Sequence, residues 1–224
     1  MKLISSILTV AILVAQADRK PNIVFILADD LGYGELGCYG QKKIRTPNID
    51  QLASQGIKFT HHYTGAPVCA PARCVLLTGL HLGHAEIRNN GDSKNGRKFP
   101  GQWPITGGAI TIAEALKEGG YVSGGFGKWG LGPTDSSGSP VKQGFDRFYG
   151  TRNFIDSYFT VLRNCQVYLD DKEVLPATET PVNHLHPDRE WYTTDVFTDY
   201  ALHFMDECFD KHPDKPLFLY IAHN

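Results

Sequence analysis

The stretch Asn22–Asp30 reads NIVFILADD. Its first seven residues form a continuous apolar run rich in β-branched side chains, which predicts a strand buried on both faces of a parallel sheet. The run ends at two adjacent acidic residues, Asp29 and Asp30. Because ligands of open α/β sheets bind outside the carboxyl ends of the strands, this stretch also predicts where the chemistry takes place.

Helical and strand patterns alternate along the rest of the chain. Helices are expected between Thr46 and Gly56, over Ala72–Thr78, from a capping box at Thr111 to Gly119, and along an apolar stripe from Val196 to Cys208. Strands are expected over Ile57–Tyr63, Tyr121–Gly127 and Leu217–Ala222, and the weakly patterned residues from Ser136 to Pro187 are expected to be mostly loop and short strands. This order predicts an α/β fold with a mostly parallel central sheet flanked by helices.

Composition narrows the class of protein. The chain has 224 residues, which suits about one domain, and its 42% hydrophobic content excludes a disordered protein. It has 22 basic and 24 acidic residues, for a net charge of −2, and no run of Lys or Arg exceeds two. A nucleic acid is therefore not expected as a partner.

The first residues have the three parts of an export signal. Met1-Lys2 is a short positive start, Leu3–Val14 is apolar, and Ala15–Ala17 has the small-x-small pattern of a cleavage site. The apolar part is too short to span a bilayer, and its alternative interpretation is a buried N-terminal helix. We expect a signal peptide over residues 1–17, a mature chain that begins near Asp18 without a membrane span, and a secreted or periplasmic location.

Two interpretations compete for the glycine-rich loop after the first strand. Residues 32–37 read GYGELG, which matches the G-x-G-x-x-G pattern of dinucleotide-binding folds. However, in that fold the helix begins within the glycines, whereas here the next helix begins only at about Thr46. The carboxylates of Asp29 and Asp30 would also repel a pyrophosphate. The alternatives are that these two carboxylates hold a hard divalent cation, calcium or magnesium, or that they are a solvated pair.

A second motif, CAPAR, occupies residues 69–73. Pro71 favours the start of a helix, which places Cys69 at or just before a helix N-terminus, where exposed amides stabilise negative charge. Arg73 lies one helical turn further on and can share the face of Cys69. The five cysteines are an odd number, so at least one is unpaired or chemically altered. The alternative is a structural Cys69 in a disulfide with Cys74 or Cys38.

With these motifs, the chain resembles the type I sulfatases of the alkaline phosphatase superfamily. The matching segments follow one another along the chain: 20–34, 46–50, 69–79, 119–129, 144–146 and 216–220. The resemblance implies an alkaline-phosphatase-like fold of which residues 18–224 form the N-terminal part of the catalytic domain. The chain is apparently truncated, since the family's second metal pair, a further lysine and a C-terminal subdomain lie downstream.

The resemblance also implies a chemistry. A formylglycine-generating enzyme would oxidise Cys69 to formylglycine; one hydroxyl of the hydrated aldehyde would attack sulfur, and the other would expel sulfate as the aldehyde re-forms. Asp29, Asp30 and residue 69 would bind Ca²⁺, with Mg²⁺ as the alternative. Arg73 would stabilise the charge on residue 69, and Lys128 would contact the sulfate.

The chain departs from the family at one site position. Residues 127–132 read GKWGLG, so Gly130 stands where many sulfatases have a histidine. A replacement contact must come from elsewhere, for which Asn153 is one candidate. His81 and His84 have the spacing of a metal pair, but without further ligands such a pair is more often structural.

The sequence thus predicts a sulfuric ester hydrolase that acts outside the cytoplasm on a sulfated carbohydrate or an aryl sulfate. Two alternatives stay open. One is an inactive, truncated sulfatase that binds sulfated glycans, and the other is a phosphatase or phosphodiesterase of the same superfamily, although those relatives commonly use serine or threonine in place of cysteine.

Overall fold

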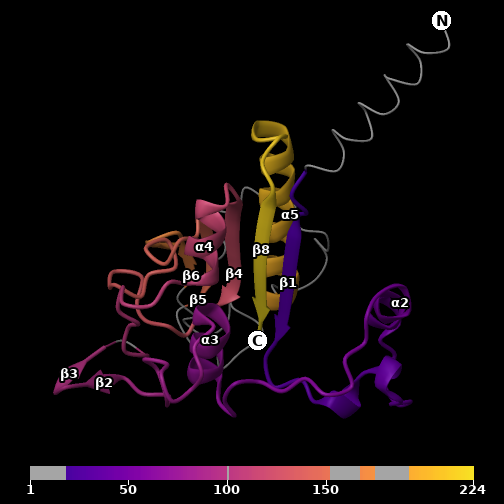
Figure 1. Cartoon of the computed structure of the whole chain (residues 1–224), viewed down its shortest axis with the longest axis horizontal. Helices are drawn as coiled ribbons and strands as arrows, with labels where there is room; N and C mark the ends of the chain where they lie inside the picture. Colours follow the sequence, from indigo (N-terminus) through magenta and orange to yellow (C-terminus); the bar gives the residue numbers. More distant parts are fainter. Residues whose placement is uncertain (1–18, 100, 152–166, 175–191) are drawn as a thin grey trace, which may run out of the picture.

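The computed structural model describes residues 19–99, 101–151, 167–174 and 192–224. The predicted signal peptide over residues 1–17 and Asn153 lie outside these ranges. Figure 1 shows helix α5 (Thr193–Lys211) behind strand β8 (Leu217–His223) and helix α4 (Ile112–Glu118) beside strand β4 (Val122–Lys128). Helix α3 (Cys69–Thr78) lies next to α4.

The sheet has six strands in the order β1-β8-β4-β5-β6-β7. β1, β8, β4 and β5 are parallel, and β6 and β7 continue the sheet as antiparallel strands. This confirms the predicted mostly parallel sheet. The strands are β1 Ile23–Ala28, β4 Val122–Lys128, β5 Arg147–Thr151, β6 Val167–Leu169, β7 Lys172–Val174 and β8 Leu217–His223, and β2 (Ser93–Lys94) and β3 (Arg97–Lys98) form a separate hairpin.

Helices α3 Cys69–Thr78, α4 Ile112–Glu118 and α5 Thr193–Lys211 flank this sheet. Helix α2 (Pro47–Gln55) and the short 3₁₀ helices η1 (Tyr33–Glu35) and η2 (Gly37–Tyr39) lie apart from it (Figure 1). α3 and α4 contribute to one apolar core and α5 to a second. The predicted helices are confirmed, although α3 begins three residues earlier than the predicted Ala72.

Alternation along β8 explains why there are two cores. Successive side chains of a strand point to opposite faces. The odd-numbered residues join the α5 core and the even-numbered ones join the α3 core, in the order Leu217, Phe218, Leu219, Tyr220, Ile221 and Ala222. Tyr220 consequently lies on the same face as α3, beneath which the candidate site is built.

Local sequence signals fix the helix ends. Thr111 Oγ1 accepts a hydrogen bond from the Glu114 amide, and the Glu114 carboxylate accepts one from the Thr111 amide, so the predicted capping box forms. Pro47 occupies the first turn of α2, and Gly79 ends α3 in the left-handed conformation.

The glycine-rich loop does not open an α-helix. Its residues form η1 and η2, and α2 begins only at Pro47. A Cβ on Gly37 would lie 2.4 Å from Asp50 Oδ2, and Asp50 Oδ1 accepts a 2.6 Å hydrogen bond from the Cys38 amide. This glycine therefore permits the close approach of Asp50, which accounts for it without a dinucleotide.

Two strand predictions were wrong. β1 is not buried on both faces: Val24 and Ile26 are 50% and 62% exposed. The strand lies at the edge of the sheet, and α5 packs on β4, β5 and β8 rather than on β1. Residues 57–63 form no strand, and their apolar side chains Ile57, Phe59 and Tyr63 are exposed. An apolar pattern alone does not specify whether another layer covers it.

Parallel pairing brings strand ends from distant parts of the chain to one edge. Ala28 at the end of β1 pairs with His223 of β8, and Gly127 near the end of β4 pairs with Ala222. Asp29 and Lys128 therefore lie at the same carboxyl edge. Gly127 has a φ of +105°, and a Cβ on it would lie 2.1 Å from the Ala222 carbonyl oxygen.

We expect Gly127→Ala to lower the free energy of unfolding by about 3 kcal/mol or more, because it adds a clash with backbone to a left-handed conformation. Gly120→Ala is the matched control. Gly120 has a φ of +84° but open space around its Cβ position, so it should lose only about 1–2 kcal/mol. Urea unfolding measures both, and equal losses would contradict the role of the β4–β8 contact.

Candidate active site

Cys69 is the first residue of α3, as its motif predicts. Val68 before it is extended and accepts the Ala72 amide at 3.0 Å, while Pro71 lies within the first turn. The Cys69 side chain is half-buried. Free amides at this helix end favour negative charge on a group held there.

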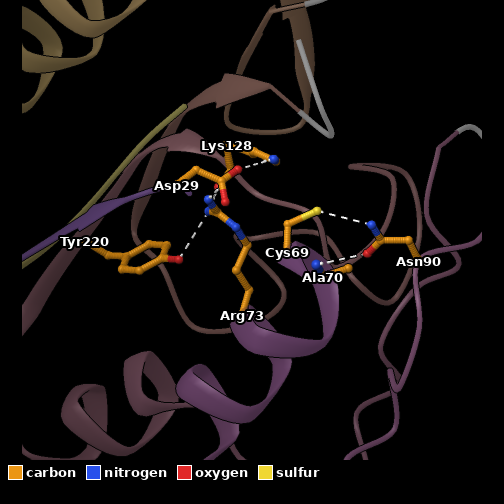
Figure 2. Close-up of polar contacts among 7 residues, drawn as sticks. All are labelled: Asp29, Cys69, Ala70, Arg73, Asn90, Lys128 and Tyr220. Atoms are coloured by element: carbon orange, nitrogen blue, oxygen red, sulfur yellow. Dashed lines mark hydrogen bonds and ion pairs between the residues drawn. The ribbon is translucent and has the colours of Figure 1, made fainter. Parts of the chain in front are cut away.

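Arg73 is buried one turn after Cys69, with 1% of its surface exposed. Its Nη1 donates hydrogen bonds to the Lys128 carbonyl oxygen and, at 3.4 Å, to the Tyr220 hydroxyl. Its Nη2 lies 3.6 Å from Asp29 Oδ2. Figure 2 shows this guanidinium between the hydroxyl of Tyr220 and the carboxylate of Asp29.

Asp29 lies between two cations. Lys128 Nζ donates to Asp29 Oδ2, the same oxygen that faces Arg73. The Lys128 and Asp29 side chains are only 6% and 16% exposed, so the pairing is weakly screened by water. Together the three side chains carry one net positive charge. Within the described part of the chain, Arg73 Nε and Nη2 have no hydrogen-bond acceptor, which suits a group that receives an anion.

Tyr220 supports the guanidinium from β8. Burial raises the pKa of its phenol, and the nearby charge of Arg73 opposes this only in part. The phenol is therefore neutral near pH 7 and can accept the Arg73 hydrogen bond. The sequence predicted Tyr220 as a core strand residue and gave no indication of this contact, because the partners are separated by 147 residues.

Asp30 follows β1 in a left-handed conformation, with a φ of 56°. Asp29, Asp30 and Cys69 all line one open hollow of about 560 Å³. However, no three His, Cys, Asp or Glu side chains of the described residues are grouped closely enough to hold an ion. The two carboxylates have the hard oxygen atoms that Ca²⁺ or Mg²⁺ prefers, but supply only part of the six or more ligands of calcium.

Disulfide pairing of Cys69 is not supported. Cys38, Cys69, Cys74 and Cys208 are all free thiols. The predicted alternative of a bond from Cys69 to Cys74 or Cys38 is therefore wrong for this structure. Cys69 differs from Cys74 and Cys208 because those two thiols are buried.

Sequence reasoning missed Asn90, which reaches Cys69 from a loop. Asn90 Nδ2 lies 3.2 Å from Cys69 Sγ, and Asn90 Oδ1 accepts the Ala70 amide at 3.2 Å. Figure 2 shows the sulfur pointing toward Asn90 and away from the Asp29 carboxylate. No motif in the sequence marks this asparagine, and the pairing follows from the course of the loop.

The remaining candidates are placed as follows. Gly130, which stands in the position of the family's histidine, has a φ of +79°, and a Cβ there would lie 3.5 Å from Arg73 Cδ. A side chain is thus absent directly beside the site. His81 serves a turn, since its Nδ1 accepts the Gly83 amide and its carbonyl accepts the His84 amide.

These features define an α/β protein with a polar site at the carboxyl edge of its sheet, where a cysteine opens a helix beside a buried arginine, a lysine and an acidic pair. The sulfatase family model matches residues 21–224, and the chain belongs to that family. This confirms the resemblance to the N-terminal part of the type I sulfatases and, with the sheet described above, the alkaline-phosphatase-like fold.

Three relatives illustrate the match. Arylsulfatase D of Homo sapiens is 42% identical over 156 residues, 65% of this chain and 24% of that protein. N-acetylgalactosamine-6-sulfatase of Canis lupus familiaris is 36% identical over 217 residues, 93% of this chain and 40% of that protein. The crystal structure of Ps i-CgsB in complex with k-i-k-neocarrahexaose has a TM-score of 0.75 and 30% identity, covering 92% of this chain and 45% of that chain. The chain thus spans less than half the length of these relatives.

Helix length and hydropathy give one further result. In the ranges that the structure describes, every helix is too short or too polar to cross a membrane.

We expect iodoacetamide at pH 8 to alkylate Cys69 in the native, unoxidised chain, and to leave Cys74 and Cys208 unmodified. Burial raises the pKa of the Cys208 thiol to about 11, so about one thiol in a thousand is ionised at pH 8. Burial also raises the pKa of Cys74.

Peptide mass spectrometry after timed quenching measures each site, and labelling in urea provides the fully exposed control. If Cys74 reacts as fast as Cys69 in the native chain, the burial of Cys74 described here is incorrect.

Proposed function

We propose that this chain carries the nucleophile and part of the anion site of a sulfuric ester hydrolase. One observation carries the proposal: Cys69 opens α3 on the same hollow as Asp29, with the buried Arg73 one turn away and Lys128 on the far side of the Asp29 carboxylate. Membership of the sulfatase family supports this assignment.

The nucleophile is formylglycine, produced from Cys69 by a formylglycine-generating enzyme. When hydrated, this group supplies one hydroxyl that attacks sulfur and displaces the alcohol of the ester. The second hydroxyl then loses its proton and expels sulfate as the aldehyde re-forms. Helix α3 stabilises negative charge at residue 69 through its N-terminal amides. Arg73 adds a fixed positive charge, and its bonds to Lys128 and Tyr220 hold the guanidinium in place before substrate arrives.

Lys128 binds the sulfate group of the substrate. Its ammonium lies at the carboxyl edge, where the strand end of β4 places it against Asp29. The monoanionic sulfate ester of a substrate that enters the hollow would compete with Asp29 for this charge. Gly130 places no side chain beside Arg73, where the family has a histidine, so a sulfate contact or a proton-transfer contact must come from another group.

Asp29 and Asp30 supply part of a site for Ca²⁺, with Mg²⁺ as the alternative. The ion would polarise a sulfate oxygen and add positive charge beside residue 69. Both carboxylates line the hollow on which Cys69 opens, and their oxygen atoms are the donors that a hard cation prefers.

The substrate is a sulfated carbohydrate or an aryl sulfate. In support, one relative is named an N-acetylgalactosamine-6-sulfatase, another is an arylsulfatase, and a third was solved with k-i-k-neocarrahexaose. The enzyme is exported by the signal peptide over residues 1–17, and it acts in a secreted or periplasmic location.

Mass spectrometry and turnover test the nucleophile. Conversion of Cys69 to formylglycine lowers the mass of its tryptic peptide by about 18 Da. In the full-length protein, Cys69→Ala should reduce the rate of hydrolysis of an aryl sulfate by about a thousandfold or more, because the residue that forms the covalent intermediate is lost. Cys38→Ala is the control and should retain the wild-type rate.

Cys69→Ser adds a second readout. Serine has no second hydroxyl to expel sulfate, so its peptide should gain about 80 Da as a trapped sulfate ester. Aryl phosphate turned over faster than aryl sulfate would instead identify a phosphatase. An unmodified thiol at residue 69, together with binding of sulfated glycans without turnover, would identify a non-catalytic glycan-binding protein.

Thermal unfolding tests the cation. Calcium at about one hundred times its dissociation constant should stabilise the native state by about 2.7 kcal/mol, which raises the midpoint by about 5 °C or more. Asp30→Ala should lose most of this shift, because it removes one carboxylate and leaves the Asp29 ion pairs intact.

The control for this experiment is Asp210→Ala, an exposed aspartate of α5. It should keep the calcium-dependent shift. A full shift in Asp30→Ala would remove Asp30 from the ligand set.

A further inference from the structure

We propose that Asn90 is a positioning residue for the nucleophile: its side-chain amide holds residue 69 in one rotamer and, after oxidation, holds one of the two oxygens on its Cβ. The contact is a property of the structure, whereas its catalytic consequence rests on the proposed function.

The amide of Asn90 contacts two successive residues at the start of α3. Nδ2 donates to Cys69 Sγ, and Oδ1 accepts from the Ala70 amide, both at 3.2 Å. A primary amide has both a donor and an acceptor, so it can make both contacts at once. The Ala70 amide is one of the groups that a helix leaves without an internal partner, and Asn90 satisfies it from outside the helix.

The contact selects one rotamer of residue 69. A side chain at this position has three staggered orientations about its first bond. Among the described residues, Asn90 makes the one hydrogen bond to Cys69 Sγ, and it draws the sulfur away from the Asp29 carboxylate (Figure 2). A second atom on Cβ would therefore have to take one of the other two orientations about the bond.

The loop that carries Asn90 is held by the core. Ile87 is fully buried three residues earlier. The Gly91 amide donates to Gln102 Oε1 at 2.9 Å, and the Gly91 carbonyl accepts the Trp103 amide at 3.0 Å. A Cβ on Gly91 would lie 2.3 Å from the Trp103 ring, so the ring packs directly against the loop backbone. Asn90 is thus presented from a fixed backbone although its side chain is exposed.

This geometry gives the two hydroxyls of the hydrated residue different positions and different roles. The two oxygens share one tetrahedral carbon, so they cannot both occupy the place of Sγ. Asn90 holds the oxygen in that place by donating into a lone pair, a stronger interaction than with sulfur because oxygen is the better acceptor. The other oxygen then takes one of the two remaining orientations and is the one left to attack the substrate.

Asn90→Asp is the sharpest test, because it preserves shape and the acceptor for Ala70 but replaces the donor with a carboxylate oxygen. In the unoxidised chain, alkylation of Cys69 at pH 8 should slow about fivefold relative to Cys38, because the thiolate loses a donor and faces a negative charge. Asn89→Asp places the same charge on the neighbouring exposed residue and should leave this ratio unchanged.

The oxidised enzyme provides the second readout. With rates corrected for the fraction of aldehyde found by mass spectrometry, Asn90→Asp should lower kcat for an aryl sulfate about tenfold and leave KM within about twofold. Asn89→Asp should change neither, and the thermal midpoints of both variants should match the wild type.

Two results would overturn the proposal. An unchanged alkylation ratio in Asn90→Asp would show that the contact does not hold residue 69, and a slower alkylation with an unchanged kcat would show that the contact has no part in turnover. If the wild type itself lacks sulfatase activity, the proposed function fails, and the alkylation ratio still decides whether Asn90 positions the side chain.

Discussion

The carboxylate of Asp29 joins three parts of the chain through ion pairs. It follows β1, and it contacts Lys128 at the end of β4 and Arg73 on α3. Both cations are largely withdrawn from water, so removing the Asp29 carboxylate leaves two buried positive charges without compensation, a loss of several kcal/mol in comparable buried groups. The parallel sheet supplies the alignment that this group needs, since it brings the ends of β1 and β4 to the same edge on either side of β8.

Arg73 depends in turn on neutral groups. Its Nη1 is fixed by the Lys128 carbonyl and by the Tyr220 hydroxyl, which stays protonated because burial raises the pKa of the phenol. These two neutral acceptors fix the guanidinium in addition to its ion pair with Asp29. Two of its nitrogen atoms, Nε and Nη2, have no hydrogen-bond acceptor among the described residues.

The sequence predicted those parts of the fold whose signals are local. The capping box at Thr111, the glycine after α3 and the stripe along α5 each depend on residues within a turn or two of one another, and each was confirmed. The edge position of β1 was missed, because a continuous apolar run does not reveal how many neighbours cover it. The strand predicted over residues 57–63 was also wrong: its apolar side chains partly alternate, but no strand among the described residues pairs with it.

The residues of the candidate site also fall into those that the sequence predicts and those that it does not. Cys69, Arg73, Asp29 and Lys128 stand in short motifs, and the structure brings them to one place. Asn90 and Tyr220 contact that group but belong to no motif, since their proximity arises only from the loop before Gly91 and from the register of β8 with β4. Contacts made by a single residue across a fold leave no pattern that one sequence can display.

The two apolar cores lie on opposite faces of the sheet and have different roles. The cluster beneath α5 includes Phe126, Tyr149 and Phe204, with the Tyr149 and Tyr200 rings stacked at 3.4 Å, and it shares no residue with the group around Asp29. We expect substitutions in this cluster to change the stability of the protein rather than the contacts around Asp29. The far side of the sheet is consequently the place to engineer a longer working lifetime, or to attach a probe to the outer surface of α5, while the chemistry at the opposite face is left as it is.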